Sequence, residues 1–131
     1  MQLIHNTKPE NIICCICPSI RTCHFEVDTD VKDIFYETFK YTGKTEEFIK
    51  KGRLFEEKQK YNIDTVLINK MMLEELGVKA ENIIDSNICS VCNKELIHSR
   101  RIEGEKYNVS LAIIELKQKK YEKVRERGKY D

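Results

Sequence analysis

Apolar residues recur along the chain with two different periods, and each period predicts a different kind of element. The run "NIICCIC" (11–17) is apolar after its first residue and rich in β-favouring isoleucine, so it predicts a buried strand. Residues 28–43, "DTDVKDIFYETFKYTG", predict a helix instead, because Val31, Phe35 and Phe39 recur at steps of four. A glycine ends this stretch, as glycine commonly does at the C-terminus of a helix.

The second half of the chain repeats this alternation of helix and strand. Residues 64–77, "DTVLINKMMLEELG", predict the clearest helix, which an aspartate caps and a glycine ends. Runs of β-favouring residues predict strands at 82–85, at 95–101 and at 109–116. The polar stretch 44–62 fits either a short helix or a loop. Helices that alternate with short strands indicate an α/β (α+β) domain with a mixed sheet and layered packing.

The length and the two ends of the chain define its domain organisation. A chain of 131 residues is enough for one domain of ordinary size. Residues 1–116 are expected to fold, whereas 117–131 are almost entirely charged and are expected to form a helical or disordered tail. Little sequence precedes the predicted strand at 11–17 to cover its other face. We therefore expect a layered domain that is truncated at its N-terminus.

Composition narrows the class of protein. Apolar residues make up 40% and charged residues 34%, and the net charge is +1, so no excess positive charge favours nucleic acid or a membrane surface. The opening "MQLIHNTKPENI" lacks the basic start and apolar run of a signal peptide. We expect a cytoplasmic protein, in which the six cysteines are thiols, metal ligands or core residues rather than disulfides.

Two CxxC pairs, Cys14/Cys17 and Cys89/Cys92, raise the question of a four-cysteine zinc site. Residues three apart in a strand point to opposite faces, so Cys14 and Cys17 would not share a metal ion. A redox dithiol at Cys89 and Cys92 would need to open a helix that lowers the thiol pKa, whereas a strand is predicted at 95–101. Burial as small apolar side chains is the alternative for most of these cysteines.

Histidines and arginines offer the other candidate chemistry. His5, His24 and His98 are spread along the chain. His24 follows Cys23, but neighbouring residues of a strand face opposite ways, which argues against a Cys–His pair. Two consecutive arginines at the end of an apolar strand could clamp a phosphate or a carboxylate, with solvated surface charge as the alternative. These two residues are Arg100 and Arg101.

Three stretches of the chain, in the right order, resemble one family. "CPSIRTCHFEV" (17–27) resembles the segment G-P-S-I-G-P-C-C-Y-E-V of the YfiH-type proteins. These are also called the multicopper polyphenol oxidase or laccase-domain family, and they are now regarded as purine nucleoside phosphorylases. Residues 63–101 resemble the family's helix ending in G-V, its C-T-x-C and its S-Y-R-R strand. "GEKYNVSLAII" (104–114) takes the place of its G-x-K-T-G-R-x-x-x-x-I, so the resemblance lies with the family's C-terminal half.

The resemblance implies a function and part of a site. It implies that the chain binds a purine nucleoside and phosphate, with Cys23 beside the active-site cleft and Arg100 and Arg101 at the family's R-R positions. The family's catalytic metal, zinc or copper, is held by two histidines and a cysteine, in upstream motifs that include T-A-D-C and H-A-G-W-R. Neither motif occurs in this chain, so we expect no metal ligand and no catalytic residue here. We predict weak or no activity for the chain alone.

Several residues depart from the family's pattern. Cys17 replaces a glycine, Arg21 and Thr22 replace the G-P turn, and Val109 stands where the family has its last arginine. Because glycine often serves a positive φ or a close backbone approach, these changes predict an altered local geometry. Two other functions stay open. One is a non-catalytic interaction module, which completes a partner as half of a split protein or self-associates, and the other is a zinc-binding adaptor that uses the CxxC pairs.

Overall fold

The computed structural model describes residues 2–115, which form two small sheets and several short helices in a mixed α/β arrangement. In chain order the helices are α1 (Gln2–His5), α2 (Thr29–Phe39), α3 (Thr45–Phe48), α4 (Thr65–Glu75) and α5 (Arg100–Glu103). The strands are β1 (Cys14–Ile16), β2 (Glu26–Val27), β3 (Ile49–Phe55), β4 (Lys58–Ile63) and β5 (Ile83–Asp85). The predicted α/β class is confirmed.

The first sheet is antiparallel, with β4 between β2 and β3. Strands β3 and β4 form a hairpin whose turn residues, Glu56 and Glu57, have φ angles of 47° and 63°. Positive φ at both turn residues matches the twist of the flanking strands. The hairpin and α3 occupy the stretch 44–62, for which the sequence favoured a short helix or a loop. The short helix is confirmed, and the two strands were not predicted. Their exposed charged side chains hide the apolar alternation that usually indicates a strand.

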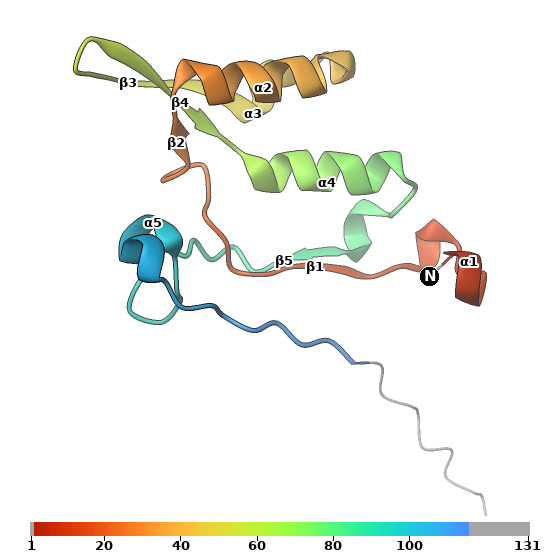
Figure 1. The fold of residues 1–131 in the computed structure, drawn as a ribbon. Helices are drawn as coiled ribbons and strands as arrows, with labels where there is room; N and C mark the ends of the chain where they lie inside the picture. Colours follow the sequence, from red (N-terminus) through yellow and green to blue (C-terminus); the bar gives the residue numbers. More distant parts are fainter. Residues whose placement is uncertain (1, 116–131) are drawn as a thin grey trace, which may run out of the picture.

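An aromatic core joins the first sheet to helices α2 and α4. Both helices lie beside this sheet in Figure 1. Phe48 and Ile63 lie at its centre and are 0% exposed. Phe35 and Phe39 of α2 pack against them, so the predicted helix at 28–43 is confirmed. The rings of Phe39 and Phe48 meet edge to face, with their centroids 5.9 Å apart. This geometry is favourable for aromatic pairs and adds to the free energy gained by burying their surface.

Helix α4 lies between the two sheets (Figure 1). Asp64 caps it, since its Oδ1 atom accepts a hydrogen bond from the backbone N–H of Leu67 at 2.9 Å. The predicted helix at 64–77 is therefore confirmed together with its cap. On the side away from the first sheet, the Nζ atom of Lys70 lies 3.0 Å from Oδ2 of Asp85 in β5. The helix thus contacts both sheets.

The second sheet is a parallel pair of β1 and β5, in which Cys14 is opposite Ile83. The strand predicted at 82–85 is confirmed. The strand predicted at 11–17 is present but shorter, and the prediction that it is buried is wrong, since Ile13 is 60% exposed. Within residues 2–115 no other strand pairs with this sheet, so both of its edges are open.

The strands predicted at 95–101 and 109–116 are wrong for the part of the chain that the structure describes. Residues 90–96 form consecutive turns, and α5 follows them. Residues 107–115 follow an extended course (Figure 1) but belong to neither sheet. Their β-favouring composition is not enough to make a strand, because a strand also needs a neighbour for its backbone hydrogen bonds.

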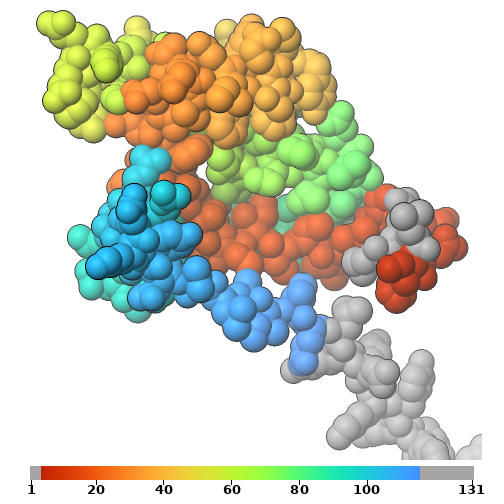
Figure 2. All heavy atoms as spheres, viewed as in Figure 1, coloured from red at the N-terminus to blue at the C-terminus, as the bar shows by residue number. Residues whose placement is uncertain are grey.

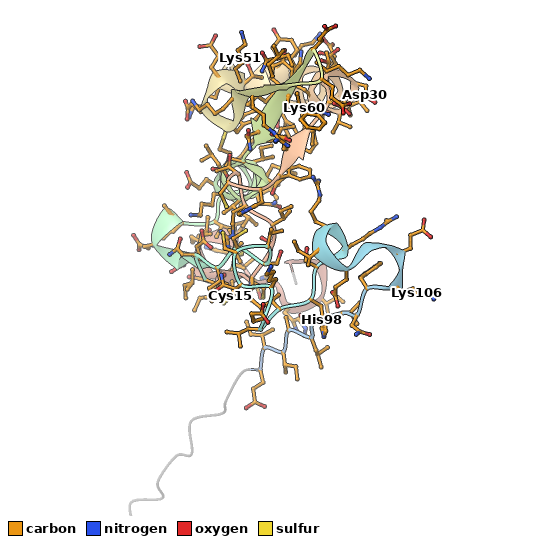
Figure 3. All side chains as sticks on the ribbon, turned by 90° about the vertical axis from the view of Figure 1, so that its left-hand side faces the viewer. Cys15, Asp30, Lys51, Lys60, His98 and Lys106 are labelled. Atoms are coloured by element: carbon orange, nitrogen blue, oxygen red, sulfur yellow. The ribbon has the colours of Figure 1, made fainter. Side chains whose placement is uncertain are left out.

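The predicted tail at 117–131 lies outside the described residues. Within residues 2–115 no helix has both the length and the apolar character needed to cross a bilayer. Helix α5 lies against the chain that leads into β2 (Figure 2), where Arg101 donates to the carbonyl oxygen of Glu26 at 3.2 Å. Lys51 lies near one end of the molecule, and Cys15 and His98 lie toward the other (Figure 3).

Candidate functional site

A tight turn before β2 places Cys23 and His24 side by side. The backbone N–H groups of His24 and Phe25 both donate to the carbonyl oxygen of Arg21, at 2.9 and 2.8 Å. In this turn the Sγ atom of Cys23 lies 3.2 Å from Nδ1 of His24. The sequence-based argument against a Cys–His pair is therefore wrong, because it assumed strand geometry at a point where the chain turns.

The second CxxC pair meets this turn from a distant part of the chain. Ser19 forms an isolated parallel bridge with Cys89, beyond the ends of β1 and β5. The backbone N–H of Ser90 donates to the carbonyl oxygen of Ser19 at 3.0 Å. The backbone N–H and the Nδ2 atom of Asn93 both donate to the carbonyl oxygen of Cys89, at 3.1 and 2.9 Å. This turn brings Cys92 back beside Cys89.

Cys23, His24, Cys89 and Cys92 form one group, which we call the Cys/His cluster. One potential ligand atom from each residue lies within 4.8 Å of the others. The Nδ1 atom of His24 is 3.4 Å from Sγ of Cys92 and 3.7 Å from Sγ of Cys89. The Sγ atoms of Cys23 and Cys92 are 3.8 Å apart. Cys89 is buried, and the other three residues are exposed.

The thiols of the cluster have different electrostatic surroundings. Burial opposes ionisation of Cys89, but hydrogen bonds from the backbone N–H groups of Cys92, Arg21 and Val91 outweigh it and lower the pKa of Cys89 to about 6. Burial, together with hydrogen bonds to Cys89 and Cys92, raises the pKa of Cys23 to about 12. These surroundings favour one thiolate next to a neutral thiol.

Arg21 ties this turn to the end of β5. Its Nη1 atom lies 2.8 Å from Oδ1 of Asp85, and its Nη2 atom donates to Oγ of Ser86 at 3.1 Å. The carboxylate of Asp85 is 9% exposed and also pairs with Lys70. Burial by itself would raise the pKa of Asp85, but the backbone N–H of Asn87 and the two cations outweigh it and lower the pKa to about 2.

The cluster contains one of the two CxxC pairs that the sequence singled out. The CxxC spacing correctly singled out Cys89 and Cys92 but suggested the wrong partners for them. Cys14 and Cys17, on and just after β1, lie outside the cluster, as strand geometry predicts. The partners are Cys23 and His24, and the sequence held one sign of them. The polar residues Arg21 and Thr22 break the apolar run and indicate a turn before Cys23.

An open pocket of about 760 Å³ lies beside the cluster and contains the two arginines singled out in the sequence. Arg100 lies over the ring of Tyr107, with 6.0 Å between the guanidinium carbon and the ring centroid. Arg101 lies over the ring of Phe25 at 5.8 Å. The arginines begin α5 and do not end a strand as predicted, yet both border the same hollow.

The structure brings Arg100 and Arg101 together but places Cys23 in the Cys/His cluster, outside the lining of this pocket. The two places are still connected. Ser19 and Ser90 line the pocket, and their backbones form the bridge that positions the second CxxC pair. A change in the cluster would therefore be transmitted to one wall of the pocket.

Comparisons with known proteins agree with this fold. Residues 1–117 match the sequence model of a family described as "Multi-copper polyphenol oxidoreductase laccase". No curated protein matches the chain. Among solved structures, the Bacillus licheniformis hypothetical protein YfiH is similar, with a TM-score of 0.61 and 22% sequence identity. The similarity covers 77% of this chain and 36% of the YfiH chain, and it confirms the predicted YfiH-type fold for the part covered.

Proposed function

The chain belongs to the multi-copper polyphenol oxidoreductase laccase family, and from this membership we propose that it supplies the anion-binding part of a site for a purine nucleoside and phosphate. The chain spans 36% of the similar YfiH protein, so it corresponds to a part of that fold. We further propose that the chain binds these ligands weakly by itself and does not turn them over.

The placement of Arg100 and Arg101 at one pocket carries this proposal. Neither guanidinium forms a salt bridge with another residue in 2–115. A guanidinium is a planar fork of donors that fits the oxygen atoms of a phosphate. The rings beneath the two arginines restrict their motion, so less conformational entropy is lost when they bind an anion.

The rest of the pocket offers the surfaces that a nucleoside needs. The side chains of Ile20, Ile97 and Val109 provide apolar area for a purine base. The hydroxyl groups of Ser99 and Ser110 can bond to a sugar. In phosphorolysis a phosphate oxygen attacks C1′ of the ribose while the bond from C1′ to the base breaks. The reaction transfers the ribosyl group to phosphate, and the arginines would hold that phosphate.

The residues described here do not fit the catalytic metal of the family. The resemblance implies a site of two histidines and one cysteine with an open position. The donors that converge within residues 2–115 are the three cysteines and one histidine of the Cys/His cluster. Four protein donors complete a tetrahedral shell, whereas a catalytic zinc ion keeps a position for water or substrate. This mismatch is the reason for expecting no turnover.

The test compares phosphate binding by two double variants that each remove two exposed positive charges. Calorimetry with inorganic phosphate should show binding to the unaltered chain and to K44Q/K51Q, whose charges lie outside the pocket. R100Q/R101Q should bind at least about tenfold more weakly, because charge-assisted hydrogen bonds to phosphate are lost. Equal binding by both variants would contradict the proposed site.

Activity is tested separately with the same samples. Incubation with inosine or adenosine and phosphate should release almost no free base, with or without added zinc. Metal-dependent release of free base would overturn the proposed inactivity, and so would metal-dependent oxidation of a polyphenol. Either result would leave the phosphate-binding measurement to be judged on its own.

We also propose a cytoplasmic location and a functional unit of residues 1–116, with 117–131 as a tail. All six cysteines are free thiols in the structure, which is the state that a reducing compartment maintains. Expression of the chain truncated after residue 116 should leave phosphate binding unchanged. A loss of binding would place part of the site in the tail.

Self-association is a second candidate function, and one observation favours it. Residues 109–115 are extended, and their apolar side chains are exposed, with Leu111 at 85% and Ile113 at 84%. An extended apolar segment without a neighbouring strand can pair with the same segment of a second copy. Light scattering across a concentration series should then show a dimer that L111D/I113D abolishes. A monomer at every concentration would remove this candidate.

A further inference from the structure

We propose that Cys23, His24, Cys89 and Cys92 bind one zinc ion in a tetrahedral site whose role is structural. The metal expected for the family would have two histidines, one cysteine and an open position, so this is a different site. It also replaces the expectation that the chain holds no metal ligands. The proposal rests on the geometry of the cluster and is independent of the function proposed for the arginine pocket.

Four of the six distances between ligand atoms of the cluster are close to those of a tetrahedron of zinc ligands, and the other two are within 4.8 Å. Zinc lies about 2.3 Å from sulfur and about 2.0–2.1 Å from nitrogen, so tetrahedral ligands are about 3.8 Å apart for two sulfurs and about 3.6 Å for sulfur and nitrogen. The Sγ atoms of Cys23 and Cys92 are 3.8 Å apart. The Nδ1 atom of His24 lies 3.2, 3.7 and 3.4 Å from the three sulfurs.

The backbone around the cluster is arranged to support thiolate ligands. The backbone N–H groups of Arg21, Val91 and Cys92 favour the thiolate of Cys89, the buried member, and lower its pKa. Zinc–thiolate sites carry a partial negative charge that such donors stabilise, and outer hydrogen bonds of this kind orient metal ligands. These donors come from both turns, so both ligand pairs are held in position before a metal arrives.

The position of the cluster explains what a metal ion would do. It joins the turn at 21–24 to the turn at 89–93, which are linked otherwise by the single bridge of Ser19 and Cys89 and by the side chain of Arg21. Cys89 and Val91 are the buried apolar residues of these two turns. A fully protein-coordinated zinc ion contributes directly to the free energy of folding.

Zinc binding fits these four side chains better than a disulfide or a Cys–His nucleophile does. The Sγ distance of 3.8 Å between Cys23 and Cys92 is that of two ligands, whereas a disulfide requires about 2.05 Å. A Cys–His nucleophile would leave Cys89 and Cys92 without a role. Three thiolates and one imidazole in a tetrahedral arrangement are typical of structural zinc.

The first experiment measures metal content in the untagged full chain. Expression in zinc-supplemented medium and dialysis should leave about one zinc ion per chain. The variant C89S should lose it, whereas the matched control C15S, which removes an exposed cysteine outside the cluster, should retain it. Less than about a tenth of an equivalent in the unaltered chain, or equal loss in both variants, would overturn the proposal.

The second experiment uses Co²⁺ as a spectroscopic probe and does not depend on a variant that might unfold. Cobalt bound by the unaltered chain should give the visible bands of a tetrahedral ion and a thiolate charge-transfer band. That band should increase in H24C, which offers a fourth sulfur, and H24A should bind cobalt more weakly than H24C. A six-coordinate spectrum, or no difference among the three proteins, would contradict the assignment.

Arg21 provides a test of the supporting shell. In R21Q the metal affinity should fall, because the side chain that ties the turn at 21–24 to Ile88 and Ser86 is lost, while the tetrahedral cobalt spectrum stays unchanged. Mass spectrometry of the reduced chain should show free thiols in the absence of metal. A Cys23–Cys92 disulfide that persists under reducing conditions would overturn the zinc proposal in favour of a covalent link.

Discussion

Two regions of this chain are held together by different forces. The sheet region comprises β2, β3 and β4 with α2 and α4, and its centre is apolar and aromatic, with Phe48 and Ile63 fully buried. The turn region comprises β1, β5 and the segments 17–25 and 86–98. It contains hydrogen bonds, the Arg21–Asp85 ion pair and the Cys/His cluster, and its buried apolar residues are Cys89 and Val91. The two sheets lie on opposite sides of α4 (Figure 1).

The different forces in the two regions predict different responses to pH and metal ions. Burial of apolar surface responds little to pH or to metal ions, so the sheet region should keep its structure across a wide range. Ion pairs and metal ligands respond directly to both. The turn region, which also forms one wall of the arginine pocket, should therefore be the part that opens first.

The largest effect should come from the core of the sheet region. Phe48→Ala removes a fully buried ring and should lower the free energy of unfolding by about 3–5 kcal/mol. Denaturant titration followed by circular dichroism measures this loss. Phe55→Ala is the matched control, because Phe55 is 42% exposed and should cost well under half as much. Equal losses would mean that the sheet region is not the dominant core.

A change at Arg21 should affect the turn region selectively. Arg21→Gln leaves the largely buried carboxylate of Asp85 with one cation fewer, which should cost about 3 kcal/mol. Hydrogen exchange should show lost protection at the amides of Ser19 and Ser90, with the amide of Asp64, which donates to the carbonyl oxygen of Phe48, unchanged. Arg53→Gln breaks an exposed ion pair with Glu26 and should cost much less, because solvent screens exposed pairs. Uniform loss of protection would contradict the division into two regions.

At low pH the turn region should lose stability before the sheet region does. The pKa of Asp85 is about 2 in the folded chain, against about 3.9 when unfolded, so its ionised form stabilises the fold. This stabilisation is complete above about pH 4 and is lost as the pH falls through about 2. Hydrogen exchange between pH 4 and 2 should therefore show the turn region opening first. Asp85→Asn should remove this pH dependence, and an unchanged acid transition in that variant would disprove the assignment.

The smallest effect should come from the helix that joins the regions. Asp64→Ala removes the hydrogen bond that caps α4 and should cost about 1 kcal/mol, measured by thermal unfolding. Asp64→Asn keeps an acceptor at the same position and should change stability by only a few tenths of that value. If both variants lose the same amount, the carboxylate charge matters and the cap does not.

The sequence predicted the elements of the sheet region that have a strong apolar period. Phe35 and Phe39 mark the face of α2, and Asp64 marks the start of α4, because both signals are local and act within one helix. The hairpin of β3 and β4 was missed, since its strands are charged on their exposed side and the sheet supplies their burial. No local pattern shows that partner.

The candidate site was predicted less completely, for a related reason. Arg100 and Arg101, which the sequence singled out, border one pocket, but their proposed role in binding stays a prediction. The Cys/His cluster was missed, since its geometry depends on whether residues 21–24 turn or extend. Apolar runs with cysteines fit both, and the choice is made by the contacts of Arg21 with residues far along the chain.

The parallel pairing of β1 and β5 also has a consequence for the order of events in folding. Cys23 and Cys92 are 69 residues apart, whereas β3 and β4 are joined by a tight turn. Closing a long loop costs more entropy than closing a short one, so the hairpin and its helices should form before the cluster. On the ribosome, the four side chains cannot meet until Cys92 has emerged. Assembly of the cluster would then mark the end of folding, and metal capture would report that a chain has completed it.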